Sequence, residues 1–261
     1  MSARFAGWLL PAVVGLAALG AWEAAIRILE IPPYIVPAPS RIALALVRDW
    51  AILGPALWFT VKIAALSLLA AVVGGGALAL LFAASPRVER SLLPYAIILQ
   101  VTPVVAVAPL IIIWVDNTTA ALLICAWIVA FFPILSNTTL GLNSADRNLG
   151  ELFRLYGASR WQTLRHLRLP AALPYFLGGL RISGGLALIG AVVAEFVAGA
   201  GGRESGLAYR ILESGYRLDI PRMFAALTLI SAAGIAIYAL LAGLSHLLLR
   251  RWHESALSRE E

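Results

Sequence analysis

The run WFTVKIAALSLLAAVVGGGALALLFA, residues 58–83, carries a single charged side chain, Lys62. A helix needs roughly 20 consecutive apolar residues to cross the hydrocarbon core of a bilayer. The apolar residues of this run are continuous and do not alternate with period two, as they would in a strand of a transmembrane barrel. A helix also satisfies all of its own backbone hydrogen-bonding groups inside the lipid. The run therefore predicts a transmembrane helix.

Comparable apolar runs recur along the chain. Of its 261 residues, 61% are hydrophobic and 13% are charged, whereas a soluble domain usually carries about 25% charged residues. We therefore predict an all-α, polytopic membrane protein in which one domain, residues 1–261, contains six transmembrane helices. The predicted spans cover approximately residues 6–28, 58–83, 93–114, 119–137, 175–199 and 223–249.

The first apolar run, residues 6–28, has two interpretations. Arg4 stands ahead of it, as a basic residue does in a cleaved signal peptide. The run is longer than the usual signal-peptide core of about 7–15 residues, and it ends at Glu23-Ala-Ala-Ile-Arg27 without a typical cleavage site. We therefore predict an uncleaved helix, in which Glu23 and Arg27 form an ion pair across one helical turn.

The net charge of +6 comes from 19 arginines and one lysine. Nucleic-acid binding is one interpretation of a basic chain, but membrane topology accounts better for where the arginines lie. Basic residues collect in the cytoplasmic segments of membrane proteins. This bias predicts cytoplasmic N- and C-termini in a protein of the cell (inner) membrane. The arginines assigned to the cytoplasmic side are Arg4, Arg87, Arg90, Arg147, Arg154, Arg160, Arg165, Arg168, Arg250, Arg251 and Arg259, and those assigned to the external side are Arg41, Arg48, Arg203, Arg210, Arg217 and Arg222.

Two longer segments are predicted on the external side. The first, residues 29–57, is rich in proline, and we expect Ser40 to cap a short helix over residues 43–50. The second begins with a glycine-rich stretch, residues 199–206. It continues into a short helix that fits either an outer-gate element that contacts a partner or a plain interfacial helix. The apolar face of this helix contains Leu207, Ala208, Ile211 and Leu212.

The predicted internal loop, residues 138–174, contains two short helices joined by a tight turn. Gly157 suits the left-handed conformation that ends a helix. Ser159-Arg-Trp-Gln162 has the capping-box pattern that begins the next helix, and we expect Leu169-Pro170 to end it. Periodicity alone fits equally an amphipathic hairpin on the inner leaflet and a helix that contacts another protein. The apolar face of the first helix contains Leu149, Leu152, Phe153 and Tyr156.

The stretch Glu151-Leu-Phe-Arg-Leu-Tyr-Gly157-(nine residues)-Leu167-Arg-Leu169-Pro170 resembles the cytoplasmic EAA loop of ABC importer permeases, Glu-Ala-Ala-x3-Gly-x9-Ile-x-Leu-Pro. Leu152 and Phe153 replace the two alanines. Other features resemble the branch of these permeases that handles sulfonates such as taurine, nitrate, bicarbonate and the pyrimidine precursors of thiamine. These features are Pro37-Ala-Pro-Ser40, Gln100-Val-Thr-Pro103, Ala108-Pro-Leu110, Trp114 and Ala194-Glu195, whereas Val115-Asp-Asn-Thr-Thr119 replaces a glycine-containing turn with a lysine that is usual in this branch.

The resemblance implies the permease subunit of an ATP-driven importer, which moves a small solute by alternating access. Its partners would be cytoplasmic ABC ATPases, an extracytoplasmic substrate-binding protein and a second permease copy or paralogue. Gly157 would form the tight turn of the internal loop, Glu151 would fix its orientation on the ATPase, and Leu169-Pro170 would end it. The apolar contact with the ATPase would come from Leu152, Phe153 and Tyr156.

Polar and aromatic residues inside the spans are candidates for the translocation path. A proline at position 103 frees a backbone carbonyl, which must face a cavity or a partner. Two aromatic residues one helical turn apart would stack a heteroaromatic substrate, although core packing accounts for them more simply. Helix packing and a structural hydrogen bond are the simpler roles of the polar candidates. The candidate residues are Gln100, Thr102, Trp127, Phe131 and Glu195.

Clusters of glycine in the spans predict close approach of neighbouring helices, because a helix without a side chain at that point lets another backbone come near. The predicted sites of close approach are Gly74-Gly-Gly76, Gly178-Gly179 and Gly184-Gly185.

The sequence contains neither an ATPase motif nor an enzyme motif. A Walker A loop needs a lysine after Gly-x4-Gly, and the single lysine is Lys62. His166, His246 and His253 lack metal-ligand spacing. We therefore expect no catalytic residue, no metal and no cofactor in this chain, with ATP used by partner subunits. Two other classes stay open: an integral membrane enzyme acting on lipid-linked substrates, which needs clustered acid and base residues, and a secondary transporter, which usually has repeated halves.

Overall fold

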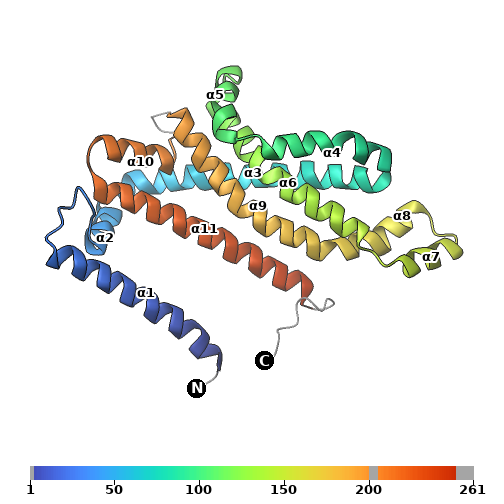
Figure 1. Cartoon of the computed structure of the whole chain (residues 1–261), viewed down its shortest axis with the longest axis horizontal. Helices are drawn as coiled ribbons and strands as arrows, with labels where there is room; N and C mark the ends of the chain where they lie inside the picture. The colour runs from blue at the N-terminus through green and yellow to red at the C-terminus, as the bar shows by residue number, and fades with distance from the viewer. Residues whose placement is uncertain (1–2, 200–204, 251–261) are drawn as a thin grey trace. The chain divides into compact units, whose positions relative to one another are not determined.

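The computed structural model describes residues 3–199 and 205–250, the side chains of residues 3–8 excepted (Figure 1). Five helices are long and apolar enough to cross a membrane, and a bent pair of helices makes up to six. The predicted all-α, polytopic membrane fold is confirmed. The helices are α1 (Ala3–Ile28), α2 (Pro39–Arg48), α3 (Trp50–Ala84), α4 (Pro86–Val101), α5 (Val104–Trp114), α6 (Thr118–Asn143), α7 (Arg147–Leu155), α8 (Arg160–Thr163), the π-helix η1 (Leu164–Arg168), α9 (Leu169–Ala198), α10 (Leu207–Tyr216) and α11 (Ile220–Leu249).

The chain forms two compact units. One contains Met1–Phe59 and Gly201–Ser231, and the other contains Thr60–Ala200 and Ala232–Glu261. The single permease domain over residues 1–261 stays a prediction. The expectations that concern the side chains of Arg4, Arg203, Arg251, His253 and Arg259 fall outside the described residues, as does most of the glycine-rich stretch that precedes α10.

In the second unit, α6 and α9 pack side by side (Figure 1). Glycines permit this contact, because a Cβ atom at Gly179 would lie 2.7 Å from the carbonyl oxygen of Pro133. A Cβ atom at Gly190 would lie 2.9 Å from Cα of Ala126. The predicted close approach is found at Gly75, Gly179 and Gly184, but nothing lies within 4 Å of Gly76, Gly178 or Gly185, and the close approaches at Gly141 and Gly190 were missed.

The predicted span over residues 93–114 is not one continuous helix. It is divided between α4 and α5, which meet at an angle of 99°. Thr102 ends α4 with an extended backbone (φ −70°, ψ 120°), and Pro103 begins α5. The proline ring disfavours the helical conformation in the residue before it and removes a backbone donor. The sequence-based prediction recognised the freed carbonyl but not the change of direction.

The expectation that Leu169-Pro170 ends the second helix of the internal loop is wrong. Residues 160–198 form one continuous helical segment, in which η1 joins α8 to α9. The wider turn brings the amide of Leu169 to the carbonyl oxygen of Leu164, five residues back. An ordinary helical turn would press the proline ring against a preceding carbonyl, and widening the helix by one residue accommodates it. Pro170 therefore stands in the first turn of α9.

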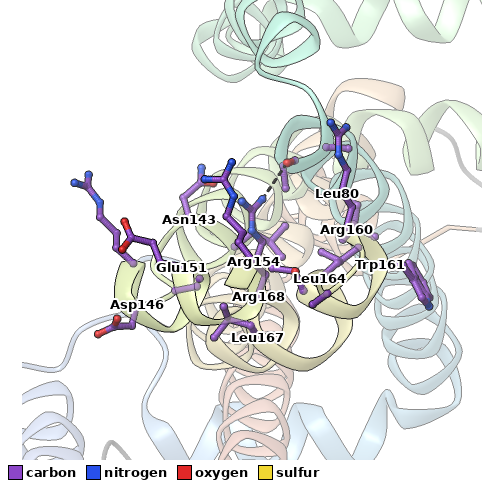
Figure 2. Close-up of a pocket in the computed structure, with 18 of the residues that line it drawn as sticks. Leu80, Asn143, Asp146, Glu151, Arg154, Arg160, Trp161, Leu164, Leu167 and Arg168 are labelled. Atoms are coloured by element: carbon purple, nitrogen blue, oxygen red, sulfur yellow. Dashed lines mark hydrogen bonds between the residues drawn. The ribbon is translucent and has the colours of Figure 1, made fainter. Parts of the chain in front are cut away.

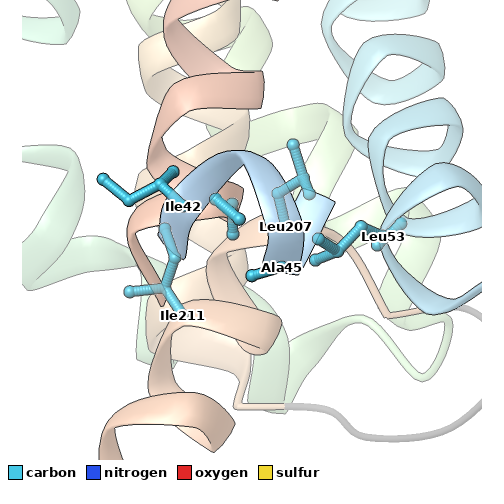
Figure 3. Close-up of a cluster of buried hydrophobic side chains, with 8 residues drawn as sticks. Ile42, Ala45, Leu53, Leu207 and Ile211 are labelled. Atoms are coloured by element: carbon cyan, nitrogen blue, oxygen red, sulfur yellow. The ribbon is translucent and has the colours of Figure 1, made fainter. Parts of the chain in front are cut away.

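In the first unit, α2, α10 and the first turns of α3 and α11 enclose a small apolar core. The short helix predicted after the glycine-rich stretch is present as α10 (Leu207–Tyr216). Of its predicted apolar face, Leu207, Ala208 and Ile211 are buried and Leu212 is half-buried. The helix α3 begins at Trp50 rather than near residue 58, because its first turns place apolar side chains in this core. Figure 3 shows the core, which contains Ile42, Ala45, Leu53, Ala56, Leu207, Ile211, Ala225 and Ala226.

Ser40 does not cap α2, which corrects the expected role of this residue. The helix covers Pro39–Arg48 instead of the predicted residues 43–50, and Ala38 is its N-cap. The Ser40 hydroxyl and amide instead donate to the carboxylate of Glu23 at 2.8 and 3.0 Å. Glu23 also pairs with Arg27 at 2.6 Å, as predicted. The carboxylate therefore ties the end of α1 to the start of α2.

Candidate functional site

The internal loop folds into a hairpin, which we define as residues 147–168 and which consists of α7, α8 and η1. Asp146 begins it, because its carboxylate accepts hydrogen bonds from the amides of Asn148 and Leu149 at 2.7 and 3.1 Å. Such a cap satisfies amides that have no partner inside the helix. The sequence-based interpretation placed the helix correctly but did not identify this cap.

The turn of the hairpin has the predicted geometry. Gly157 has a φ of +68°, in the left-handed region, and its amide donates to the carbonyl of Arg154 at 3.0 Å. The Ser159 amide donates to Oε1 of Gln162 at 2.7 Å, and the Gln162 amide donates to Oγ of Ser159 at 3.2 Å. These reciprocal bonds form the capping box that the sequence predicts. Backbone bonds and caps therefore determine the shape of the turn.

Large apolar side chains project from the hairpin into solvent. Leu155 and Tyr156 are each 84% exposed, and Trp161 is 64% exposed. Clusters of exposed large apolar residues are typical of surfaces that bind another molecule. Of the residues predicted to make an ATPase contact, Tyr156 and Leu152 are exposed, and Phe153 is half-buried. The prediction omitted Leu155 and Trp161, although Leu155 stands three residues after Leu152, at helical spacing.

A cavity of about 930 Å³ lies against the hairpin (Figure 2). It is bounded by the hairpin, by the last turns of α3 and α6, and by the residues that connect α6 to α7. Arg168 is anchored at its edge, since Nη1 donates to the carbonyl oxygen of Ala83 at 3.1 Å. Glu151 is exposed and lines the cavity. The charged residues of the lining are Asp146, Arg147, Glu151, Arg154, Arg160 and Arg168.

The candidate path residues fall into three groups in the second unit. Gln100 is exposed, and Thr102 lies at the bend between α4 and α5, where its hydroxyl donates to the carbonyl of Ile98 at 2.7 Å. Within α6, the rings of Trp127 and Phe131 are 4.9 Å apart and tilted by 46°. No hydrogen bond or ring contact joins one group to another among the described side chains.

Glu195 forms the third group. It is buried near the end of α9, and its Oε2 accepts a hydrogen bond from the Thr60 hydroxyl of α3 at 3.1 Å. This bond joins two spans that are far apart in the sequence. It fits the structural hydrogen bond that the sequence left as an alternative to a role in the path.

The first unit contains an ionic cluster that the sequence analysis missed. Asp49 accepts from Arg48 at 2.8 Å and from Arg222 at 3.0 Å, and Asp219 lies 3.2 Å from Arg48. Burial alone would raise the pKa of Asp49, but the two arginines outweigh it and hold this pKa below its usual value. The two halves of the cluster, Arg48-Asp49 and Asp219 with Arg222, are distant in sequence, so no local pattern could have indicated that they meet.

A nearby ion pair lies along α10. Glu213 is paired with Arg210 at 2.8 Å and with Arg217 at 2.9 Å. The hydrogen bond from Arg210, opposed in part by burial, lowers the pKa of the Glu213 carboxyl. The two arginine-paired carboxylates of Asp49 and Glu213 therefore carry their charge at neutral pH.

Comparison with known proteins identifies the family. Residues 71–258 match the model of the family described as binding-protein-dependent transport system inner membrane component. The chain is 38% identical over 242 residues to the riboflavin transport system permease protein RibX of Chloroflexus aurantiacus. The matched region covers 90% of this chain and 86% of that protein. It is 34% identical over 233 residues to the formylaminopyrimidine transport permease protein ThiX of Halalkalibacterium halodurans. This matched region covers 87% of this chain and 90% of that protein.

A solved structure supports the same fold. The crystal structure of an amino acid ABC transporter with histidines matches with a TM-score of 0.63 at 18% identity and covers 80% of this chain and 97% of that chain. At this identity the likeness concerns the fold alone.

The helical spans and the hairpin define a multi-pass membrane protein of the transport class. The chain belongs to the family of binding-protein-dependent transport system inner membrane components. It is therefore a membrane-spanning permease subunit of an ABC importer, and not an enzyme. This family works with ATPase subunits and a substrate-binding protein.

Proposed function

We propose that the hairpin is the surface through which the ATPase subunits drive this permease. The observation that carries the proposal is the exposure of Leu155 and Tyr156 at the tip of α7, since both side chains are 84% exposed and lie beside the tight turn. Burying such side chains at an interface stabilises a complex by roughly 1.5–3 kcal/mol each. In this proposal Leu152 and Phe153 extend the apolar contact, and the carboxylate of Glu151 orients it.

The path of force follows from the continuity of the chain. The hairpin passes through η1 into α9 without a break, so that residues 160–198 move as one helical segment. The helix α9 packs closely on α6, and α6 leads into the hairpin at its other end. A displacement of the hairpin by the ATPases therefore reaches both helices of this pair. In the proposal Gly157 keeps the turn tight, while Leu169 and Pro170 belong to the joint between hairpin and span.

The finer composition of the transporter belongs to the same proposal. We infer a complex in which this chain pairs with a second copy or a paralogue in the cell (inner) membrane, with both termini in the cytoplasm. The arginine distribution supports this orientation, because the hairpin alone carries Arg147, Arg154, Arg160, Arg165 and Arg168. ATP is used by the partner subunits, and this chain needs no cofactor of its own.

For the cargo we propose a small, flat heteroaromatic solute. Two relatives with more than 30% identity are named for riboflavin and formylaminopyrimidine, both of which contain nitrogen heterocycles. Trp127 and Phe131 form an aromatic pair inside a span, and aromatic side chains favour offset or tilted contact with another ring. In this proposal Gln100, Thr102 and Glu195 supply the polar groups of the path.

The coupling role is tested with the turn glycine. Gly157→Val places a β-branched residue at a positive φ, which is a strained conformation for it. We expect the protein to accumulate in the membrane while copurification of the ATPase and solute uptake fall together. Gly185→Val is the control, because Gly185 lies in α9, outside the hairpin, with nothing within 4 Å of its added Cβ. Uptake unchanged in Gly157→Val would remove the coupling role.

The cargo is tested by uptake of labelled riboflavin, a pyrimidine and an alkanesulfonate into cells that express the complete transporter. We expect the heteroaromatic compounds to enter and the sulfonate to be excluded. Trp127→Leu should reduce uptake while leaving the amount of assembled transporter unchanged. Uptake of the sulfonate alone, or uptake that is insensitive to Trp127→Leu, would contradict the proposed cargo and the proposed path.

A further inference from the structure

We propose that the cavity beside the hairpin binds the phosphate head group of an anionic phospholipid of the inner leaflet. The inference rests on the proposed cytoplasmic location of the hairpin. It differs from the ATPase contact, which we assign to the exposed apolar side chains around the turn.

The lining of the cavity is positively charged. Four arginines and two acidic residues line the cavity, and the carboxylate of Asp146 is already engaged in capping α7. Among residues 9–199 and 205–250, none of the four arginines forms an ion pair with a carboxylate. The cavity therefore has an excess of positive charge within a concave surface, where the attraction for an anion is strengthened. The four are Arg147, Arg154, Arg160 and Arg168.

Two of the guanidinium groups come together at one side of the cavity. Figure 2 shows the side chains of Arg154 and Arg168 directed to the same side of the cavity, beside Asn143. They come from α7 and η1, and the bond from Arg168 Nη1 to the Ala83 carbonyl holds one of them in place. Two like charges held together repel each other unless an anion lies between them. The planar fork of arginine binds phosphate oxygens in pairs, which makes phosphate the fitting anion.

The same lining also has an apolar part. These apolar side chains distinguish a phospholipid from free phosphate as the ligand. Leu80 and Leu142 stand near the ends of α3 and α6, and Leu164 and Leu167 belong to η1. An inorganic phosphate ion would need none of these leucines and would occupy a small part of about 930 Å³. A phospholipid places its phosphate at the arginines and its glycerol and first acyl carbons against the leucines. Basic pockets at the cytoplasmic ends of transmembrane helices bind anionic head groups in this way.

The position of the cavity gives this site a consequence for transport. Its walls include the connection from α6 to α7 and the π-helix that leads into α9. A bound head group therefore contacts both ends of the hairpin where they join the spans. We infer that anionic lipid stiffens these two joints, so that the movement of the ATPases reaches α6 and α9 more completely.

The experiment uses the purified complex of this chain with its copurifying ATPase. The complex is reconstituted into vesicles of phosphatidylcholine with increasing fractions of phosphatidylglycerol. The first readout is the phosphatidylglycerol that stays with the complex after mild detergent extraction, measured by mass spectrometry. The second is solute uptake as a function of the phosphatidylglycerol fraction. The variants are Arg154→Gln with Arg168→Gln, the same pair changed to lysine, and the matched control Arg87→Gln with Arg90→Gln, whose arginines lie in α4 outside the hairpin, are exposed and do not line the cavity.

We expect each lost arginine to weaken retention of phosphatidylglycerol about fivefold, since one basic residue near an anionic surface contributes about 1 kcal/mol. The lysine pair should fall between the parent and the glutamine pair, because it keeps the charge and loses the paired geometry. Uptake by the parent should rise with phosphatidylglycerol, and uptake by the glutamine pair should not. The control should follow the parent in both readouts.

Three outcomes would overturn the proposal. The first is equal loss of retention in the control, which would show a general surface charge effect. The second is binding of inorganic phosphate to the same arginines in pure phosphatidylcholine vesicles, which would make free phosphate the ligand. The third is loss of the ATPase from the glutamine pair with unchanged lipid retention, which would assign the cavity to the ATPase. A parent chain that retains phosphatidylglycerol through these arginines but copurifies no ATPase would count against the proposed function alone.

Discussion

The helix pair α6 and α9 and the hairpin that connects them differ in where their side chains find partners. The two helices bury many residues against each other, and the Ser183 hydroxyl of α9 donates to the Ala130 carbonyl of α6 at 2.7 Å. In α7, α8 and η1, all of whose residues are described, no residue is buried. The hairpin obtains its shape from caps and backbone bonds, and its largest apolar side chains at the turn remain exposed. The difference indicates that the pair is completed within the chain, whereas the hairpin is completed by other molecules.

The largest effect is expected where the helix pair has no room for a side chain. Gly179→Leu would place Cβ 2.7 Å from a backbone carbonyl of α6, which cannot move without displacing the helix. Overpacking of this kind costs about 1–3 kcal/mol or more. We expect loss of folded protein from the membrane, measured as the monodisperse fraction after detergent extraction.

The neighbouring glycine provides the control. Gly178 lies one residue earlier in α9 with nothing within 4 Å of its added Cβ, so that Gly178→Leu adds the same side chain to open space. It should leave the monodisperse fraction near that of the parent. Equal losses in the two variants would mean that the close approach of α6 and α9 does not limit folding.

The second prediction changes the hairpin instead of the helix pair. Leu155→Ala combined with Tyr156→Ala removes two side chains from the hairpin that are each 84% exposed. We expect the thermal stability of the purified permease to stay within about 0.5 kcal/mol of the parent. Copurification of the ATPase should fall at least tenfold, because these side chains are the proposed apolar contact.

The matched variant is Tyr95→Ala, which removes an aromatic side chain that is 69% exposed on α4, outside the hairpin. It should keep the ATPase. Retention of the ATPase by the Leu155 and Tyr156 double variant would contradict the assignment of the hairpin tip.

The sequence predicted what short-range interactions determine and missed what depends on a facing partner. The left-handed Gly157 and the capping box of Ser159 and Gln162 are set within a few residues, and both were predicted correctly. The bend at Pro103 was not, because a proline inside an apolar run is compatible with a kinked helix and with a broken one. Nor does the sequence distinguish Gly178 from Gly179, since only the position of α6 decides which of them is crowded.

The candidate site shows the same limit. Its hairpin and its apolar face could be predicted from spacing, whereas the cavity required four arginines from separate turns to be brought together with the ends of α3 and α6. In the ionic cluster, the pair of Asp49 with Arg222 likewise joins two residues that no local pattern connects.

The third prediction weakens the helix pair without crowding it. Ser183→Ala removes the hydroxyl that is buried between α9 and α6 and leaves the Ala130 carbonyl with one partner fewer. Loss of such a bond costs about 0.5–1.5 kcal/mol. We expect a small fall in thermal stability with unchanged copurification of the ATPase. Ser91→Ala is the control, because the Ser91 hydroxyl bonds only to the Arg87 carbonyl of its own helix and is exposed. A larger fall in thermal stability in Ser91→Ala than in Ser183→Ala would contradict the role given to the Ser183 hydroxyl.

The smallest effect is expected from the cap of the hairpin. Ser159→Ala removes the acceptor of the Gln162 amide and costs about 1 kcal/mol of local helix stability. This corresponds to about fivefold faster hydrogen exchange of the Gln162 amide, while the amides of α6 and α9 should exchange as in the parent. The hairpin and the helix pair should respond separately, because no side chain of the hairpin is buried against the pair. Faster exchange throughout α6 and α9 in this variant would show instead that the hairpin and the helix pair unfold as one unit, and the exposed tip would then be part of a single rigid element.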